Sequence, residues 1–218
     1  SDEIHPNGRR LFRSRIIPYR GSWVEFTTDI NNILYVHIDR KRKQPATMLL
    51  RALGFQSNEE IIELFHQVET IKITKPGTKK FKELEDSLEG RILAADVHRP
   101  GEDDPFVKAG AIIDALTRES ILAAGLKEIK LVAEGEVSLN EPSLILNTLR
   151  KDPTSNQDEG LRRFYSLLRP GDPPNEEVAR ALFERLFFNE KRYDLAEVGR
   201  YKMNRRLNLD VDPKVTTL

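Results

Sequence analysis

Three runs of residues between positions 9 and 39 constrain the fold more than any other feature. RRLFRSRII (9–17) mixes cationic and apolar positions in an extended manner, and WVEFTT (23–28) and ILYVHID (33–39) are rich in β-branched and aromatic residues. Residues of turn type separate the runs, with Pro18 and Gly21 in the first connection. This pattern predicts a three-stranded antiparallel meander at the amino end.

The connection between the first two runs, RIIPYRGSW (15–23), carries groups that suit a binding surface. Arg20 supplies a bidentate cation and Trp23 a ring face. In strand alternation Trp23 shares its face with Glu25 and Thr27, which favours exposure of the ring. Two interpretations stay open, namely an edge that faces nucleic acid and a core tryptophan beside a surface arginine.

Four consecutive cations, Arg40 to Lys43, follow the third run. They are either a solvated connection between a strand and a helix, or a segment that follows a phosphate backbone within reach of Trp23. The formal net charge of the chain is zero, which argues against a polyanion binder that uses its whole surface. The charge is unevenly spread, because residues 1–54 carry ten Lys/Arg against five Asp/Glu, and residues 55–135 carry eleven against sixteen.

Helical patterns follow the meander, and the character then changes at about Val68. Pro45 and Gly54 bound a short helix, and a capping box at 57–60 (SNEE) begins another. The next stretch predicts a self-contained α+β insert. Its strand-like segments are VETIKIT (68–74), GRILAADVH (90–98), GAIID (110–114) and KEIKLVAEGE (127–136), and its helix, TRESILAAG (117–125), has Thr117 as a possible cap.

The carboxyl third is predicted to be helical. The first helix is halted by Asp152-Pro153, and the second is capped at Ser155 or Asn156. The third is capped at Asn175 and has a core stripe of Val178, Leu182 and Leu186 beside Phe183 and Phe187. The fourth is capped at Asp194 and has a basic end of Arg200, Lys202, Arg205 and Arg206. Arg150 and Arg169 stand at helix ends, where an arginine can either compensate the helix dipole or face a partner.

Several classes of function find no support in the residues. The chain has no cysteine and only four scattered histidines, which argues against disulfides and a zinc centre and favours a reducing compartment. The acidic group at 102–104 lacks the spacing of a calcium loop, so a solvated loop is expected there. No catalytic constellation, signal peptide or apolar run of roughly 18 residues is present, and a cytoplasmic protein is expected.

Five motifs occur in an order that resembles a known family. RIIPYRGSW, IDRKRKQPATMLLRALGF, TLRKDPT, LLRPGDPP and LFFNEKRYDLAEVGRYKMNRRL are similar to the lobe region of the beta subunit of bacterial DNA-directed RNA polymerase. The likeness covers residues 9–62 and about 143–209. The weaker stretch between them falls where that lobe carries an insertion that varies between bacterial lineages.

The resemblance implies a fold class and a division into domains. The expected fold is α+β, a small antiparallel β-meander packed with several helices plus a smaller inserted α+β module. The lobe is expected to be discontinuous, at 1–62 and 136–218, and the lineage-specific insert is expected at 63–135. The start without Met and the end without a closing helix favour a fragment of a longer chain.

The resemblance also implies a role in transcription. The lobe of this family lies over downstream DNA and touches the non-template strand of the open bubble, where the residue matching Trp23 stacks on a base. Arg150 and Arg169 match arginines along the path of that strand, and Asp39 and Arg40 match residues near the bubble. Lys41 stands where an arginine is common, so it is left out, and the physical interpretation of the edge adds Arg20. The implied nucleic-acid-binding set is Trp23, Arg20, Asp39, Arg40, Arg150 and Arg169.

The chemistry and the partners follow from the same resemblance. The intact polymerase is a nucleotidyltransferase, whereas this fragment has no catalytic residue, cofactor or metal of its own, because magnesium is bound by the beta-prime subunit. The implied partners are DNA, the rest of beta, beta-prime, alpha, omega and sigma factor, with no membrane. Two alternatives remain, a free-standing adaptor whose acidic insert binds a protein and a small RNA-binding protein.

Overall fold

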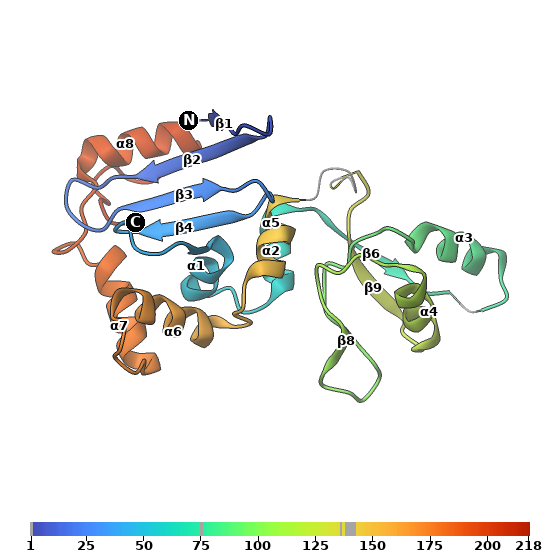
Figure 1. The fold of residues 1–218 in the computed structure, drawn as a ribbon. Helices are drawn as coiled ribbons and strands as arrows, with labels where there is room; N and C mark the ends of the chain where they lie inside the picture. The colour runs from blue at the N-terminus through green and yellow to red at the C-terminus, as the bar shows by residue number, and fades with distance from the viewer. Residues whose placement is uncertain (1, 75, 136, 138–142) are drawn as a thin grey trace. The chain divides into compact units, whose positions relative to one another are not determined.

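The chain folds into two compact units of mixed helix and strand. The computed structural model describes residues 2–74, 76–135, 137 and 143–218 (Figure 1). The first unit comprises residues 1–54 and 152–218, and the second comprises residues 55–151. The predicted α+β class is confirmed.

The first unit contains the predicted meander within a larger antiparallel sheet. The strands, in spatial order, are β1 (Asp2–Ile4), β2 (Arg10–Ile16), β3 (Val24–Thr28), β4 (Leu34–Ile38) and β5 (Gln44–Pro45). The register sets Arg15 opposite Glu25 and Glu25 opposite His37, so one residue from each of three neighbouring strands forms a row across the sheet. The three central strands confirm the prediction, and β1 and β5 extend the sheet at its edges.

Four helices, which are labelled in Figure 1, complete the first unit. They are α1 (Ala46–Leu53), α6 (Gln157–Leu168), α7 (Glu176–Phe187) and α8 (Ala196–Leu207). α1 packs against β4 and, more extensively, against α6. Gly160 permits this close approach, because a Cβ there would lie 2.9 Å from Arg51 Cβ and 3.1 Å from the Met48 carbonyl oxygen. Segments that are a hundred residues apart in sequence thus form one core.

Aromatic residues of α6 and α7 form the centre of that core. The rings of Phe164 and Phe183 meet edge to face, with 4.9 Å between their centroids, and Phe187 packs against both. The predicted stripe on α7 was wrong at Val178, which is exposed, whereas Ala179 is buried in line with Phe183 and Phe187. The stripe that includes Val178 and the stripe that includes Ala179 both have helical spacing. The phenylalanine rings are larger, and they determine which of the two faces packs into the core.

The second unit has its own small core. Its elements are α2 (Asn58–Phe65), β6 (Val68–Lys72), α3 (Lys79–Leu88), β7 (Val97–His98), β8 (Pro105–Val107), α4 (Ala115–Ala123), β9 (Glu128–Val132) and α5 (Leu144–Lys151). β6 pairs with β9, and β7 pairs with β8, both antiparallel. Leu88, Leu93, Ile113, Ile121 and Leu131 are almost completely buried between these elements.

Local predictions for the second unit were only partly correct. The strand expected at 110–114 is reduced to a single bridge between Ile112 and Ile92, and most of 90–98 is irregular. The Lys/Glu-rich stretch after Gly77 forms α3, a helix that was not predicted from the sequence. α4 begins earlier than expected, because the Asp114 carboxylate and not Thr117 caps it; the hydrogen bonds from Thr117 lower the pKa of Asp114.

The compact second unit extends beyond the insert expected at 63–135. α2 and α5 pack against each other, so residues before and after the expected boundaries belong to the same unit. Compactness and evolutionary insertion are different properties. The boundaries of a lineage-specific insert therefore stay a prediction.

Candidate nucleic-acid interface

The backbone of Trp23, just before β3, makes two hydrogen bonds to Asp39. Its N–H donates to the Asp39 carboxylate at 2.8 Å, and its carbonyl accepts the Asp39 N–H at 3.0 Å. Trp23 is 37% exposed, in agreement with the exposure predicted from its strand face, although it lies one residue before the strand. Asp39 thus fixes the backbone from which the ring projects.

Asp39 and Arg40 form a tight turn that places a cation over the ring. The Lys41 N–H donates to the Ile38 carbonyl at 2.9 Å, and φ is +48° at Asp39 and +57° at Arg40. Two successive positive φ values are the pattern of a type I′ turn, which glycine and asparagine usually occupy. The guanidinium carbon of Arg40 lies 5.2 Å from the centroid of Trp23, within cation–π range.

A pocket of about 300 Å³ lies beside Trp23. Trp23 and Arg40 line it together with the cross-strand row of Arg15, Glu25 and His37. Glu25 forms an ion pair with Arg15, and the His37 imidazole lies 3.2 Å from a hydroxyl of β3, that of Thr27. In the part of the chain that the structure describes, Arg40 makes no ion pair, so its charge is the uncompensated one at this site.

Arg20 is more constrained than its place in the motif suggested. Its backbone pairs with Asp194 in both directions, and its guanidinium donates to the Glu190 carbonyl at 3.1 Å. Next to it Gly21 has φ of +126°, and a Cβ there would lie 2.7 Å from the ring of Tyr193. Glycine is therefore required on steric grounds, and the turn is anchored to the segment that precedes α8.

Asp194 belongs to the same anchor. Its carboxylate accepts the Ala196 N–H at 2.7 Å, so it serves the start of α8 as predicted, although Leu195 is the residue at the N-cap position. Hydrogen bonds from the Ala196 N–H and the Thr216 hydroxyl, with the Arg20 charge, lower the pKa of Asp194. Arg200, which the sequence places in the basic end of this helix, is buried and donates to the carbonyls of Val215 and Thr217.

The other two predicted arginines lie outside the Trp23 pocket. Arg169 ends α6, is exposed and lies 4.0 Å from the Asp172 carboxylate. Arg150 belongs to the second unit, where its guanidinium donates to the Gly110 carbonyl at 3.0 Å. The structure therefore brings together Trp23, Asp39 and Arg40, while Arg20, Arg150 and Arg169 have local partners of their own.

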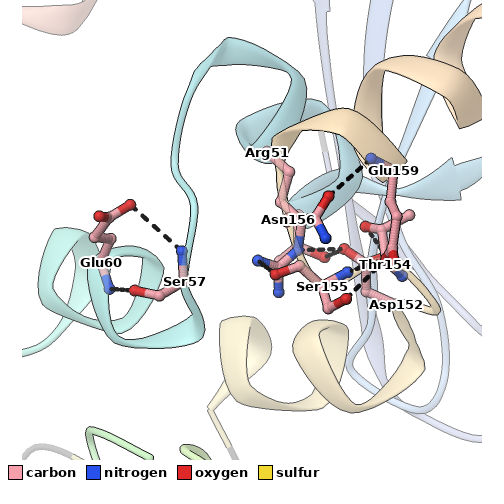
Figure 2. Close-up of polar contacts among 9 residues, drawn as sticks. Arg51, Ser57, Glu60, Asp152, Thr154, Ser155, Asn156 and Glu159 are labelled. Atoms are coloured by element: carbon pink, nitrogen blue, oxygen red, sulfur yellow. Dashed lines mark hydrogen bonds and ion pairs between the residues drawn. The ribbon is translucent and has the colours of Figure 1, made fainter. Parts of the chain in front are cut away.

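A buried ion pair closes the first unit where the chain leaves it and returns (Figure 2). Arg51 and Asp152 are 3.7 Å apart and almost fully buried. The Asp152 carboxylate also accepts hydrogen bonds from the Thr47 hydroxyl at 2.5 Å and from the Thr154 N–H at 2.9 Å, and Arg51 donates to the Ser155 carbonyl at 3.0 Å. The sequence predicts Asp152 only as a helix stop and gives no sign of this buried pair.

Two helix caps beside these junctions follow the predicted chemistry. Ser57 and Glu60 form a complete capping box at α2, with the Glu60 N–H donating to the Ser57 hydroxyl at 3.1 Å. At α6 the cap is Asn156, the second of the two predicted candidates, and Glu159 reaches back to the Ser155 N–H at 2.7 Å. Figure 2 shows both sets of contacts.

The Trp23 pocket offers groups that can bind a ligand. Among the described residues, no group of three or more His, Cys, Asp or Glu side chains is arranged to hold a metal ion. A ring face with an adjacent uncompensated guanidinium suits a ligand that carries both a flat π system and a negative charge. Over the same described ranges, none of the helices is long and apolar enough to span a membrane.

Comparisons with known proteins show which family the chain is similar to. The model of the family described as RNA polymerase Rpb2, domain 2, matches residues 1–90 and 125–218. The chain is 40% identical to the DNA-directed RNA polymerase subunit beta of Flavobacterium psychrophilum over 95% of its length, and 42% identical to that of Phocaeicola vulgatus over 98%. These matches cover only 17% and 18% of the relatives, so the chain spans less than a fifth of their length.

Proposed function

The chain belongs to the RNA polymerase Rpb2, domain 2 family, and on this premise we propose that it forms the lobe of a bacterial RNA polymerase beta subunit. In this role it contributes to transcription by contacting downstream DNA and the non-template strand of the open bubble. The observation that carries the proposal is the pocket in which Trp23 and Arg40 present a ring face and an uncompensated cation.

Each group in the proposed surface has a distinct role. Trp23 stacks on an unpaired base, a contact worth about 1–3 kcal/mol per base. Arg40, Arg150 and Arg169 neutralise phosphates, and Asp39 positions Trp23 through its two backbone contacts. Arg20 anchors the turn to the segment around Asp194 and adds its charge from there.

The proposed mechanism is positional. The chemistry of nucleotide transfer belongs to the intact polymerase, with magnesium held by the beta-prime subunit, and this chain supplies a surface that holds the separated strand. Its proposed partners are DNA, the remaining polymerase subunits and sigma factor, in the cytoplasm. The insert expected within the second unit is a separate appendage that docks a regulator.

The experiment that tests this function is binding of the 218-residue chain to a fluorescent single-stranded DNA at low and moderate salt. We expect weak binding that salt reduces, because phosphate contacts release counterions. Trp23→Ala should weaken binding about 5- to 150-fold, the equivalent of one lost base stack. Combined Arg150→Ala and Arg169→Ala should mainly make the salt dependence shallower.

A matched control is Phe12→Ala, which removes another exposed ring of the same sheet that does not line the pocket. Its affinity should equal that of the wild type. The proposal fails if the wild type does not bind, or if Trp23→Ala binds as well as Phe12→Ala.

A further inference from the structure

Arg40 lies against one face of the ring that the proposed function requires to be accessible. Its guanidinium carbon lies 5.2 Å from the centroid of Trp23, and both side chains line the same pocket. A base inserted between them would need two layers at van der Waals separation, roughly 7 Å in total. The base and the guanidinium therefore cannot occupy this face of Trp23 together in the observed geometry.

We infer that Arg40 is a gate on Trp23: an arriving base displaces the guanidinium from the ring, and the guanidinium then pairs with a phosphate of the same strand. This inference rests on the proposed function and adds to it the order of events and the ligand class. The ligand is a nucleotide unit, base and phosphate together, and not a bare base or a bare anion.

The surroundings of Arg40 explain why it is the movable member of the pocket. Glu25 holds Arg15 in an ion pair, and the Asp39 carboxylate accepts the backbone N–H of Trp23. Arg40 is exposed, and none of the described residues forms an ion pair with it. Its backbone is fixed in the turn closed by the Lys41 N–H, so only the long side chain has to swing.

The gate predicts opposite effects of Arg40 on charged and uncharged strands. For an uncharged strand, Arg40 is only a competitor for the ring, and removing it should strengthen binding. For natural DNA, removing Arg40 ends its competition for the ring but also removes a phosphate contact, so the two effects on affinity oppose each other. The lost phosphate contact makes the affinity less dependent on salt. A simple basic patch would give weaker binding of DNA and no effect on the uncharged strand.

The test uses the fluorescence of Trp23, the only tryptophan in the chain. Single-stranded oligothymidylate and its uncharged methylphosphonate analogue are titrated into the wild type and into Arg40→Asn, a replacement chosen because asparagine tolerates positive φ. Arg40→Asn should bind the analogue about two- to fivefold more tightly, the equivalent of the lost cation–π contact. For DNA, the slope of log affinity against log salt should become shallower by about 0.7.

Lys41→Asn is the matched control, since it removes a neighbouring exposed cation that does not line the pocket. It should leave affinity for the analogue unchanged. If Arg40→Asn binds the analogue as the wild type does, or more weakly, the gate is refuted while stacking on Trp23 stands. If neither ligand changes the emission of Trp23 in any variant, stacking itself is refuted, and the gate with it.

Discussion

Two arginines of the first unit have opposite environments. Arg51 is 1% exposed and is held by the Asp152 carboxylate and the Ser155 carbonyl, where the chain leaves the unit and returns to it. Arg40 is exposed, and its guanidinium lies near the ring of Trp23. The difference teaches that basic residues of one motif, IDRKRKQPATMLLRALGF, have separate structural places: one is buried and closes the fold, and the other is exposed at the proposed binding surface.

The largest expected effect comes from breaking the buried pair. Asp152→Ala leaves the Arg51 charge buried without its carboxylate, and we expect a loss of about 3–5 kcal/mol in the free energy of unfolding. Denaturant titration measures it. Glu176→Ala, which removes an exposed partner of Arg180, is the control and should cost less than about 1 kcal/mol. Equal losses in both variants would show that the buried pair does not stabilise the unit.

The next effect concerns the helix contact that surrounds Arg51. Gly160→Ala places a methyl group 2.9 Å from Arg51 Cβ and 3.0 Å from the Ala52 nitrogen, so α1 and α6 must separate, at a cost of about 1–3 kcal/mol. Thermal or denaturant unfolding checks this. Gly199→Ala in α8 is the matched control, since its nearest neighbour is 3.3 Å away and alanine favours helix. A Gly160→Ala chain as stable as Gly199→Ala would contradict tight packing.

The next expected effect is a dependence of stability on pH that arises from Tyr193, whose ring packs beside Gly21 in the turn before β3. Burial raises the pKa of Tyr193 to about 12, above its ordinary value of 10.0. Because the pKa is higher in the folded chain, the neutral phenol contributes fully to the free energy of unfolding below pH 10. That contribution is lost as pH rises towards 12. Tyr193→Phe should change the free energy of unfolding by less than about 1 kcal/mol at neutral pH. Between pH 10 and 12, the free energy of unfolding of this variant should fall less steeply than that of the wild type. Parallel pH curves for the two chains would argue against a buried neutral phenol.

The smallest effect on stability is expected at the exposed arginine. Arg40→Asn should alter the free energy of unfolding by no more than about 0.5 kcal/mol, because the side chain is exposed and asparagine suits the turn. Denaturant titration of the same variant used for binding measures it. A loss as large as that of Asp152→Ala would mean that Arg40 also maintains the fold, and the contrast between the two arginines would disappear.

The sequence predicted the parts of the fold that depend on local pattern. The three central strands, the capping box at Ser57 and the exposure of Trp23 all follow from alternation, turn residues and side-chain hydrogen bonding. It did not predict the burial of Arg51 and Arg200, because their partners at Ser155 and Thr217 are distant in sequence or are backbone carbonyls with no residue signature. Contacts of that kind appear only once the chain is folded.

The candidate site also has some features that the sequence indicated and others that appear only in the folded chain. A resemblance in motifs indicated Trp23 and Arg40, and the structure adds the turn with positive φ that sets one over the other. The row of Arg15, Glu25 and His37 that lines the pocket depends on strand register, which the order of residues alone does not fix.

The most direct test of the proposed surface is the emission of Trp23 during titration with natural single-stranded DNA, compared with the affinity from a labelled strand under the same salt. We predict that the emission changes and saturates at the same dissociation constant, because the sole tryptophan lines the pocket proposed to bind DNA. Binding of the labelled strand with no change in the emission of Trp23 would place the DNA elsewhere on the chain and contradict stacking on this ring.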